Sequence, residues 1–328
     1  MLSLPMRQKM TLNYGKMDAV KYISLDISRL KTCSISDRQS KVSAEALATP
    51  HIKGYPFKAF VSGLPDILAS SDLKSVVAAI VSAVKNSRPV ILGMGAHPIK
   101  VGLSPVIIDL IRKDIITAVA ANGACIVHDF EMAFIGKTSE DVASELKTGS
   151  FGMARETGRM VNTAVRKGVS EGLGIGSSMG AFISQSDFPH KDKSLFSEGF
   201  LKDIPMTVHV AVGCDIIHMH PEADGASIGE GSLRDFRLLS SVVADLEGGV
   251  YINLGSSVIL PEVFLKALTV ARNLGHKVED FTTVNMDFIQ HYRPRENVLR
   301  RPGGRSYSLT GHHEIMFPLL AAMITEAL

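Results

Sequence analysis

The chain has 328 residues, of which 45% are hydrophobic and 21% are charged, and its formal net charge is +2 at pH 7. This near-neutral balance, with both signs spread along the chain, excludes the basic footprint of a nucleic-acid-binding protein. The apolar runs are far shorter than the roughly 18 residues that a membrane-spanning helix needs, so we expect no membrane contact. Three cysteines and the absence of a secretory signal pattern lead us to expect a cytoplasmic protein.

The amino-terminal part of the chain is its least regular part. Residues 1–70 are interrupted by Pro, Gly and Ser and have a weak apolar pattern, so we interpret them as an arm or cap. Residues 71–328 are expected to form a single α/β domain with a helical insertion at about 138–205. Within the insertion we predict three helices and one glycine-rich break, at 138–147, 151–168, 193–202 and 171–180 respectively.

Short apolar runs that end in Gly, Asn, His or Asp recur from residue 89 onward. Each run is about as long as a strand and is followed by a helical pattern, which predicts repeated βα units and a parallel sheet. The predicted strands are 89–94, 117–121, 207–212, 249–254, 281–286 and a short one near 307. The predicted helices outside the insertion are 73–84, 106–112, one from about 129 to 136, 233–246, 261–273 and 314–327. Ligands bind outside the carboxyl ends of such strands, so the polar residues there are the candidate site.

Two glycine-containing stretches bear on nucleotide binding. Residues 93–98 (GMGAHP) follow a predicted strand, and backbone N–H groups at the start of a helix favour an anion. The spacing is not that of GxGxxG, and an ordinary tight βα turn is the alternative. Residues 172–180 look more like a dinucleotide fingerprint, but a helical pattern precedes them, so we interpret them as a flexible connection.

Residues 122–131 place several polar groups around one predicted strand end. Asp129 and Glu131 could simply suit the start of a helix, by capping it and by interacting with its dipole. That alternative does not explain Asn122 or His128 equally well. Because imidazole titrates near neutrality, His128 is a candidate for proton transfer.

Residues 209–224 form the densest cluster of ionisable side chains. In an extended segment His218 and His220 would share one face, and imidazole with a carboxylate such as Asp224 suits zinc or another first-row metal. The cluster has no HExxH or CxxC signature. We therefore favour hydrogen-bonded histidines that line a pocket, and a divalent metal held by these three residues is the alternative.

Two further candidates lie near the carboxyl terminus. His312 and His313 precede the last predicted helix, and either histidine could line a pocket or be solvated. Glu314 suits the N-terminus of that helix. The loop 291–305 contains five arginines, including Arg293 and Arg301, whose guanidinium groups can bind carboxylate or phosphate. A solvated surface loop is the alternative for this segment.

Taken in order over roughly residues 88–325, these motifs resemble deoxyhypusine synthase. The segments that carry the resemblance are 94–102, 122–129, 210–215, 254–259 and Phe317-Pro-Leu-Leu. The resemblance implies a Rossmann-like, doubly wound parallel sheet of the deoxyhypusine synthase type, NAD as cofactor, and a homo-oligomer, either dimer or tetramer. It implies that the cofactor is held by Gly95, His97, Asn122, Gly123, Asp129, Asp215, Gly255 and His313.

Several departures separate this chain from that family and suggest a distant, bacterial-type homologue. In that family a lysine in the segment before the last strand forms an imine with the substrate. No lysine follows Lys277 in this chain. Arginine cannot replace it, because the guanidinium group stays protonated. Pro261 stands at about the position of the family's active-site histidine, Ser256 and Ser257 replace glycines, and His128 replaces an acid. Deoxyhypusine synthesis is therefore not expected.

Residues 122–136 are also similar to the NAD-binding domain of the archaeal-type ornithine cyclodeaminases. The favoured hypothesis is an NAD-using transferase or lyase that acts on a small-molecule substrate. His128, His218 or His312 would move protons, and Arg293 or Arg301 would bind substrate anions. One alternative is a metal-dependent hydrolase or lyase that uses the histidine cluster. Another is a non-catalytic relative that binds a nucleotide or a partner protein.

Overall fold

The computed structural model describes residues 22–328, which divide into two compact units at residue 43. The described part of the first unit contains two short 3-10 helices, Ile27–Arg29 and Ile35–Asp37. Asp26 and Ser34 cap these helices by accepting backbone N–H groups. The second unit, Ala44–Leu328, begins with the 3-10 helix Ala44–Ala46 and the short helix α1 (Phe57–Ser62), and it contains all the strands described below.

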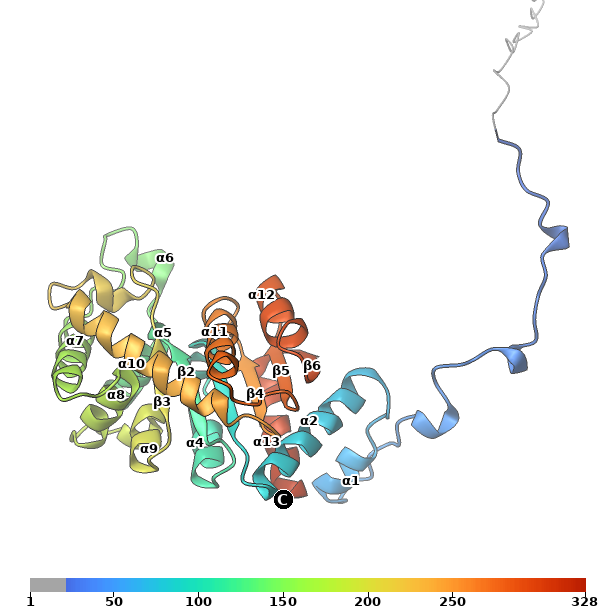
Figure 1. Cartoon of the computed structure of the whole chain (residues 1–328), viewed down its shortest axis with the longest axis horizontal. Coiled ribbons are helices and arrows are strands. Elements are labelled where there is room, and N and C mark those ends of the chain that lie inside the picture. The colour runs from blue at the N-terminus through green and yellow to red at the C-terminus, as the bar shows by residue number, and fades with distance from the viewer. Residues whose placement is uncertain (1–21) are drawn as a thin grey trace, which may run out of the picture. The chain divides into compact units, whose positions relative to one another are not determined.

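A six-stranded sheet forms the centre of the second unit (Figure 1). Its strands are β1 (Val90–Met94), β2 (Ala118–Asn122), β3 (Met206–His209), β4 (Val250–Leu254), β5 (Thr282–Asp287) and β6 (Arg305–Thr310). Their spatial order is β3-β2-β1-β4-β5-β6, and every neighbouring pair is parallel. The predicted Rossmann-like, doubly wound α/β fold is therefore confirmed.

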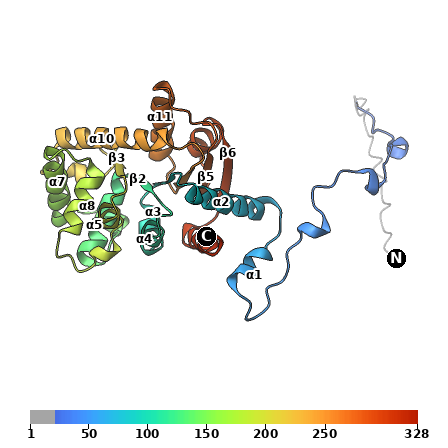
Figure 2. The ribbon, with the colours of Figure 1, turned by 60° about the horizontal axis from the view of Figure 1, so that its bottom comes forward.

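Helices cover both faces of the sheet (Figure 2). Leu92 and Met94 of β1 belong to one hydrophobic cluster and Ile91 to the other, because successive strand residues point to opposite faces. Helices that pack on the first face are α2 (Leu68–Lys85), α4 (Ser104–Arg112), α5 (Gly123–Ile135), α8 (Ile175–Ser184), α9 (Leu195–Leu201) and α13 (His313–Ala327). Helices α10 (Gly225–Ala244) and α11 (Ile259–Asn273) cover the second. Burial of both faces explains why the central strands are continuous apolar runs.

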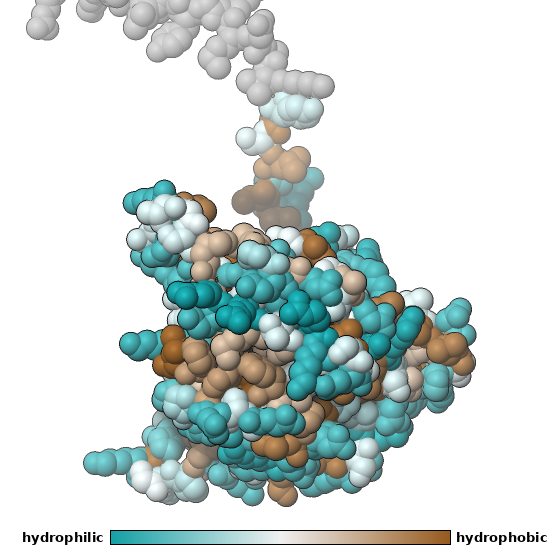
Figure 3. Space-filling model, turned by 90° about the vertical axis from the view of Figure 1, so that its left-hand side faces the viewer, coloured by the Kyte–Doolittle hydropathy of each residue, from teal (hydrophilic) through white to brown (hydrophobic). Residues whose placement is uncertain are grey.

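The connection between β2 and β3 is helical, and it includes α6 (Val142–Glu145) and α7 (Arg155–Ser170). Figure 3 views the molecule from the side on which α7 lies, and apolar patches there are bordered by hydrophilic residues. Within residues 22–328, no helix combines the length and the hydrophobicity that crossing a bilayer requires.

Several predicted elements differ from the observed ones. Helix α5 starts at Gly123 and not near residue 129, because the Asn122 side chain caps it by accepting the Cys125 N–H. Strand β3 ends at His209, before the predicted end at residue 212. The predicted helix 138–147 shrinks to α6, and the loop 291–305 contains α12 (Tyr292–Pro294) and the π-helix Arg295–Arg300.

The predicted glycine-rich break is also wrong, because most of it is helix α8. A Cβ on Gly176 would lie 1.9 Å from the carbonyl oxygen of Met206. The glycine therefore allows α8 to pack closely on the chain that enters β3, and it does not interrupt the helix.

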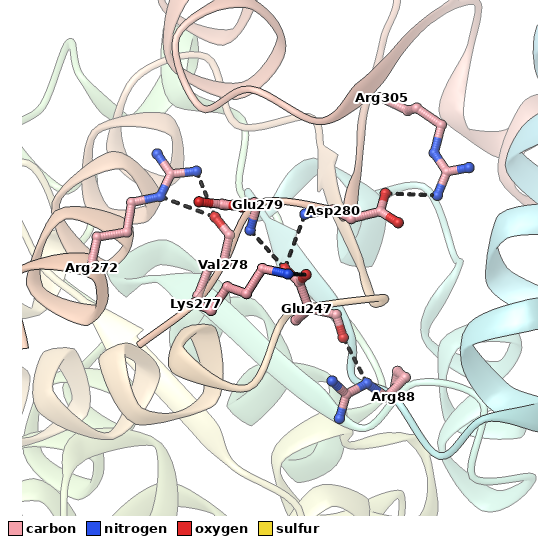
Figure 4. Close-up of polar contacts among 8 residues, drawn as sticks. All are labelled: Arg88, Glu247, Arg272, Lys277, Val278, Glu279, Asp280 and Arg305. Atoms are coloured by element: carbon pink, nitrogen blue, oxygen red, sulfur yellow. Dashed lines mark hydrogen bonds and ion pairs between the residues drawn. The ribbon is translucent and has the colours of Figure 1, made fainter. Parts of the chain in front are cut away.

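A polar network joins the amino-terminal ends of neighbouring strands (Figure 4). The carboxylate of Glu247, just before β4, accepts the backbone N–H groups of Glu279 and Asp280 at 2.7 and 2.9 Å. Its main-chain carbonyl accepts the Arg88 Nε–H at 2.6 Å. Lys277 Nζ lies 3.3 Å from the same carboxylate. The last lysine of the chain therefore pairs with Glu247 at the amino-terminal ends of the strands, away from their carboxyl ends.

Candidate functional site

The carboxyl ends of β1 and β4 are neighbours at the centre of the sheet. After β1 the chain passes through α3 (His97–Lys100) and α4 on one face, and after β4 it passes through α11 on the other. This is the topological switch point, where open α/β sheets bind their ligands. The Gly95 N–H donates to the Leu254 carbonyl at 3.1 Å. A Cβ on Gly95 would lie 2.5 Å from the carbonyl oxygen of Gly255, so the two turns can only approach this closely with glycine.

Histidine and aromatic side chains gather beside the Gly255 turn. His313, the first residue of α13, is 1% exposed, and its ring centroid lies 5.3 Å from that of His97 and 5.8 Å from that of Phe288. Its Nε2 lies 3.3 Å from the Met286 carbonyl oxygen and 3.6 Å from Oδ1 of Asp287. Its Nδ1 is buried and has no hydrogen-bond partner in the described part of the chain. Burial lowers the pKa of His313, which favours the neutral imidazole.

A second group of polar side chains surrounds a cavity of about 210 Å³ on the β2–β3 side of the switch point. The lining comes from α3, from the start of α5, from the segment 139–151 and from the loop after β3, and its ionisable members are Lys100, His128, Glu131, Glu140, Cys214 and Asp215. Asp215 is 8% exposed and accepts the Ala124 N–H, so it also occupies the start of α5. Burial raises the pKa of Asp215 to about 6. A Cβ on Gly123 would lie 2.1 Å from this carboxylate, so Gly123 is required by the contact.

The imidazole of His128 lines this cavity and is held by one hydroxyl group. Its Nδ1 lies 2.7 Å from the Thr138 hydroxyl, which donates to Glu131 at 2.6 Å. The other oxygen of Glu131 accepts the Thr157 hydroxyl at 3.0 Å. Burial lowers the pKa of His128, with a smaller opposing effect from Glu131. His128 is therefore a neutral, oriented imidazole near pH 7.

Asp129 does not line this cavity. It is completely buried in the middle of α5 and accepts the Ser194 hydroxyl at 2.5 Å and the Leu195 N–H at 2.7 Å. Burial raises its pKa to about 6. The expectation that Asp129 contacts a cofactor is replaced by a structural role, because α5 begins earlier than predicted and turns this carboxylate towards α9.

The histidines of the 209–224 cluster do not share one face. Residues Ile216–Met219 form a 3-10 helix and not an extended segment. His218 Nδ1 accepts a backbone N–H, His220 Nε2 bonds to a main-chain carbonyl, and Asp224 caps α10. Across residues 22–328, no three His, Cys, Asp or Glu side chains are grouped so that they could hold a metal ion. The alternative metal site at His218, His220 and Asp224 is therefore not assembled.

The remaining candidates lie at the surface. The His312 side chain is 71% exposed and stacks near Phe288 at a centroid distance of 6.3 Å. Arg293 pairs with Glu262 at 3.1 Å, and Arg301 donates to Asn297. None of these three lines the 210 Å³ cavity. Their roles in proton transfer and anion binding stay predictions.

Sequence reasoning did not single out Lys100, Thr138 or Phe288. Phe288 directly follows the strand end at Asp287, so its position was a usable signal. Thr138 lies beyond the helix end at Gly136, where no local pattern indicates that its hydroxyl returns to His128.

No protein-family model and no curated protein matches the sequence. Among solved structures, the ternary complex of AgrE with ornithine and NAD+ aligns with a TM-score of 0.53 and 13% identity. The apo structure of ArgZ, an arginine dihydrolase from the ornithine–ammonia cycle in cyanobacteria, aligns at 0.52 and 14%. Both alignments cover 80% of this chain and 34% of the other, so this chain spans about a third of their length.

A putative deoxyhypusine synthase from Entamoeba histolytica is also a structural neighbour. It aligns with a TM-score of 0.48 and 13% identity over 83% of this chain and 93% of that one. At these identities the likeness is one of fold.

Proposed function

We propose that this chain is an enzyme that binds NAD at the carboxyl edge of its sheet and acts on a small molecule without making deoxyhypusine. The observation that carries the proposal is the close pairing of the Gly95 and Gly255 turns at the switch point. Beside them lies Nδ1 of His313, which has no hydrogen-bond partner among residues 22–328. The likeness of fold to AgrE, whose structure contains ornithine and NAD+, supports NAD as the ligand.

The start of α11 fits the diphosphate of a dinucleotide. This 15-residue helix follows the Gly255 turn, and its N-cap residue, Val258, makes no side-chain cap. Ser256 Oγ accepts the Leu260 N–H and Pro261 has no N–H, so the N–H groups left without a side-chain acceptor in the described chain are those of Ser257, Val258 and Ile259. Such an N-terminus favours an anion through its N–H groups and its dipole. Gly95, Gly255 and the start of α11 would hold the diphosphate.

The start of α5 is less suited to phosphate, because Asn122 and Asp215 already accept its N–H groups. We assign this side to the sugar. Asp215 has capacity for further donors, so it suits a ribose hydroxyl next to Asn122 and Gly123. His97 and His313 flank the other side of the switch point. Bound NAD would supply a hydride acceptor in this crevice.

The loss of deoxyhypusine synthesis is proposed from the position of the lysines. Lys277 is paired with Glu247 at the opposite edge of the sheet, and no lysine follows it in the chain. The imine-forming group is thus missing from the β5–β6 side of the crevice. A homo-oligomer, dimer or tetramer, in the cytoplasm remains part of the proposal, and light scattering on the purified chain tests the assembly.

A pair of variants at Val258 tests the binding site. Val258→Asp and Val258→Asn place side chains of the same size and shape at the start of α11, and these differ only in charge. In calorimetric titrations with NAD+ and ADP-ribose, we expect Val258→Asn to bind within about twofold of the native protein. Val258→Asp should bind at least about tenfold more weakly, which corresponds to 1.4 kcal/mol. Equal melting temperatures of the two variants would exclude a folding effect. A native protein that binds neither NAD+ nor NADH would refute the proposal.

A further inference from the structure

We infer that His128 Nε2 is a proton acceptor for a substrate group in the 210 Å³ cavity, and that Thr138 and Glu131 are the residues that position it. Its role in a reaction rests on the proposed function, whereas the state of the imidazole follows from the hydrogen bonds alone.

The hydrogen bonds of the Thr138 hydroxyl have a defined direction. A hydroxyl has one proton, and an ionised carboxylate has none to give. Thr138 therefore donates its hydroxyl hydrogen to Glu131, at an O–O distance of 2.6 Å. Its oxygen can then only accept from His128, at 2.7 Å, so Nδ1 carries the imidazole proton. The neutral ring is thus the Nδ1–H tautomer, and the lone pair is on Nε2.

The chain of hydrogen bonds from His128 through Thr138 is anchored at Glu131. Both oxygens of Glu131 are held by hydroxyls, one from Thr138 beyond the end of α5 and one from Thr157 on α7. Thr157 is 3% exposed, so this anchor is part of the core. A carboxylate that orients an imidazole through hydrogen bonds is the arrangement by which a histidine becomes an effective base. Here a threonine hydroxyl lies between the two.

The surroundings of His128 Nε2 suit a proton acceptor. His128 lines the cavity, and Nε2 has no protein partner within the described residues. Burial and Lys100 both lower the pKa of His128, so the ring is neutral and can accept a proton near pH 7. Once formed, the imidazolium is stabilised by Glu131, whose charge opposes the lowering of the pKa of His128.

The proposed reaction is a proton transfer. A hydroxyl or amino hydrogen of the substrate passes to Nε2, and the electron pair of the broken bond stays on the oxygen or nitrogen. The Nδ1 proton remains bonded to Thr138 throughout. At about 210 Å³ the cavity is smaller than the usual range of roughly 300–1,000 Å³ for small-molecule sites, so it admits only the reacting part of the substrate.

Nuclear magnetic resonance of the full chain, labelled with 15N in histidine, tests the tautomer. Long-range proton–nitrogen correlations report which ring nitrogen is protonated, and His128→Gln assigns the signal. We expect the Nδ1–H form in the native protein, in Thr138→Ser and in the matched control Thr157→Val, which removes the other hydroxyl from Glu131. Thr138→Val should populate both tautomers and lower the pKa of His128. An Nε2–H native ring, or an unchanged Thr138→Val spectrum, would overturn the inference.

Reaction with diethyl pyrocarbonate, followed by peptide mass spectrometry, tests whether Nε2 is an available base. The native protein and Thr138→Ser should be modified at His128 at the same rate. In Thr138→Val the rate should fall at least about twofold, in proportion to the population of the competent tautomer. A native His128 that does not react contradicts its role as acceptor. NAD+ affinity should be the same in Thr138→Val and native protein, so failure of the Val258 test and failure of this one are separate results.

Discussion

The carboxylate of Asp129 accepts the hydroxyl hydrogen of Ser194, which lies 65 residues later in the chain. The same carboxylate accepts the Leu195 N–H, so α5 provides an anion at the start of α9. Asp129, which the sequence suggests as a cofactor contact, is therefore part of the core. We expect this residue to contribute to stability and not to cofactor binding.

Asp129→Asn should lower the free energy of unfolding by about 1–3 kcal/mol, because one carboxylate oxygen becomes an NH2 group and one buried donor is left without an acceptor. NAD+ affinity should change by less than about twofold, well below the tenfold that 1.4 kcal/mol represents. Urea denaturation and calorimetric titration measure the two quantities. Ser194→Ala, which removes one cap of α9, should cost only about 1 kcal/mol. A large loss of affinity in Asp129→Asn at unchanged stability would restore the cofactor role.

Asp215 should make stability depend on pH. Its pKa is raised to about 6 in the folded protein from an ordinary value of 3.8, so the native state binds its proton more tightly than the unfolded state does. Stability therefore falls as pH rises from about 4 to about 6 and is flat above. Asp215→Asn removes this contribution, and the two curves of unfolding free energy should diverge by about 2–3 kcal/mol over that window. Parallel curves from urea titrations at each pH would show that the carboxyl is not perturbed.

Gly255→Ala should be more destabilising than Gly303→Ala. Both glycines have positive φ, at +64° and +85°, so each substitution costs about 1 kcal/mol of backbone strain. A Cβ at Gly255 would also lie 2.6 Å from Cε1 of His313, whereas nothing lies within 4 Å at Gly303. The overlap should add about 1–3 kcal/mol. Thermal unfolding compares the pair, and combining Gly255→Ala with His313→Ala should recover the excess.

Glu247→Ala tests whether the two edges of the sheet are independent. The substitution removes the acceptor of the Glu279 and Asp280 N–H groups in the network of Figure 4. We expect the melting temperature to fall by a few degrees, since about 1 kcal/mol corresponds to roughly 2–4 °C for a domain of this size. NAD+ affinity should stay within about twofold of the native value. A strong loss of affinity would mean that the amino edge is coupled to the switch point.

The sequence alone determined the strands and the class of fold. Residues 90–94 and 250–254 are buried along their whole length, so each had to be a continuous apolar run that ends where the chain reaches the polar edge. Such runs are visible without any knowledge of their neighbours. The same pattern placed Gly95, Asn122 and Gly255 among the candidates, because glycine or asparagine at the end of a buried strand stands out locally.

Only the tertiary structure decided what these side chains contact. The sequence put Asp129 near the start of a helix because acids are common there, but Asn122 caps α5 earlier and Asp129 faces Ser194. It noted His128 but not Thr138, whose hydroxyl fixes the tautomer from beyond the turn at Gly136. It grouped His218 with His220, which the 3-10 helix separates. A buried strand can be recognised from its own run of apolar residues. Hydrogen-bond partners depend on how distant segments pack, and that packing exists only in the folded chain.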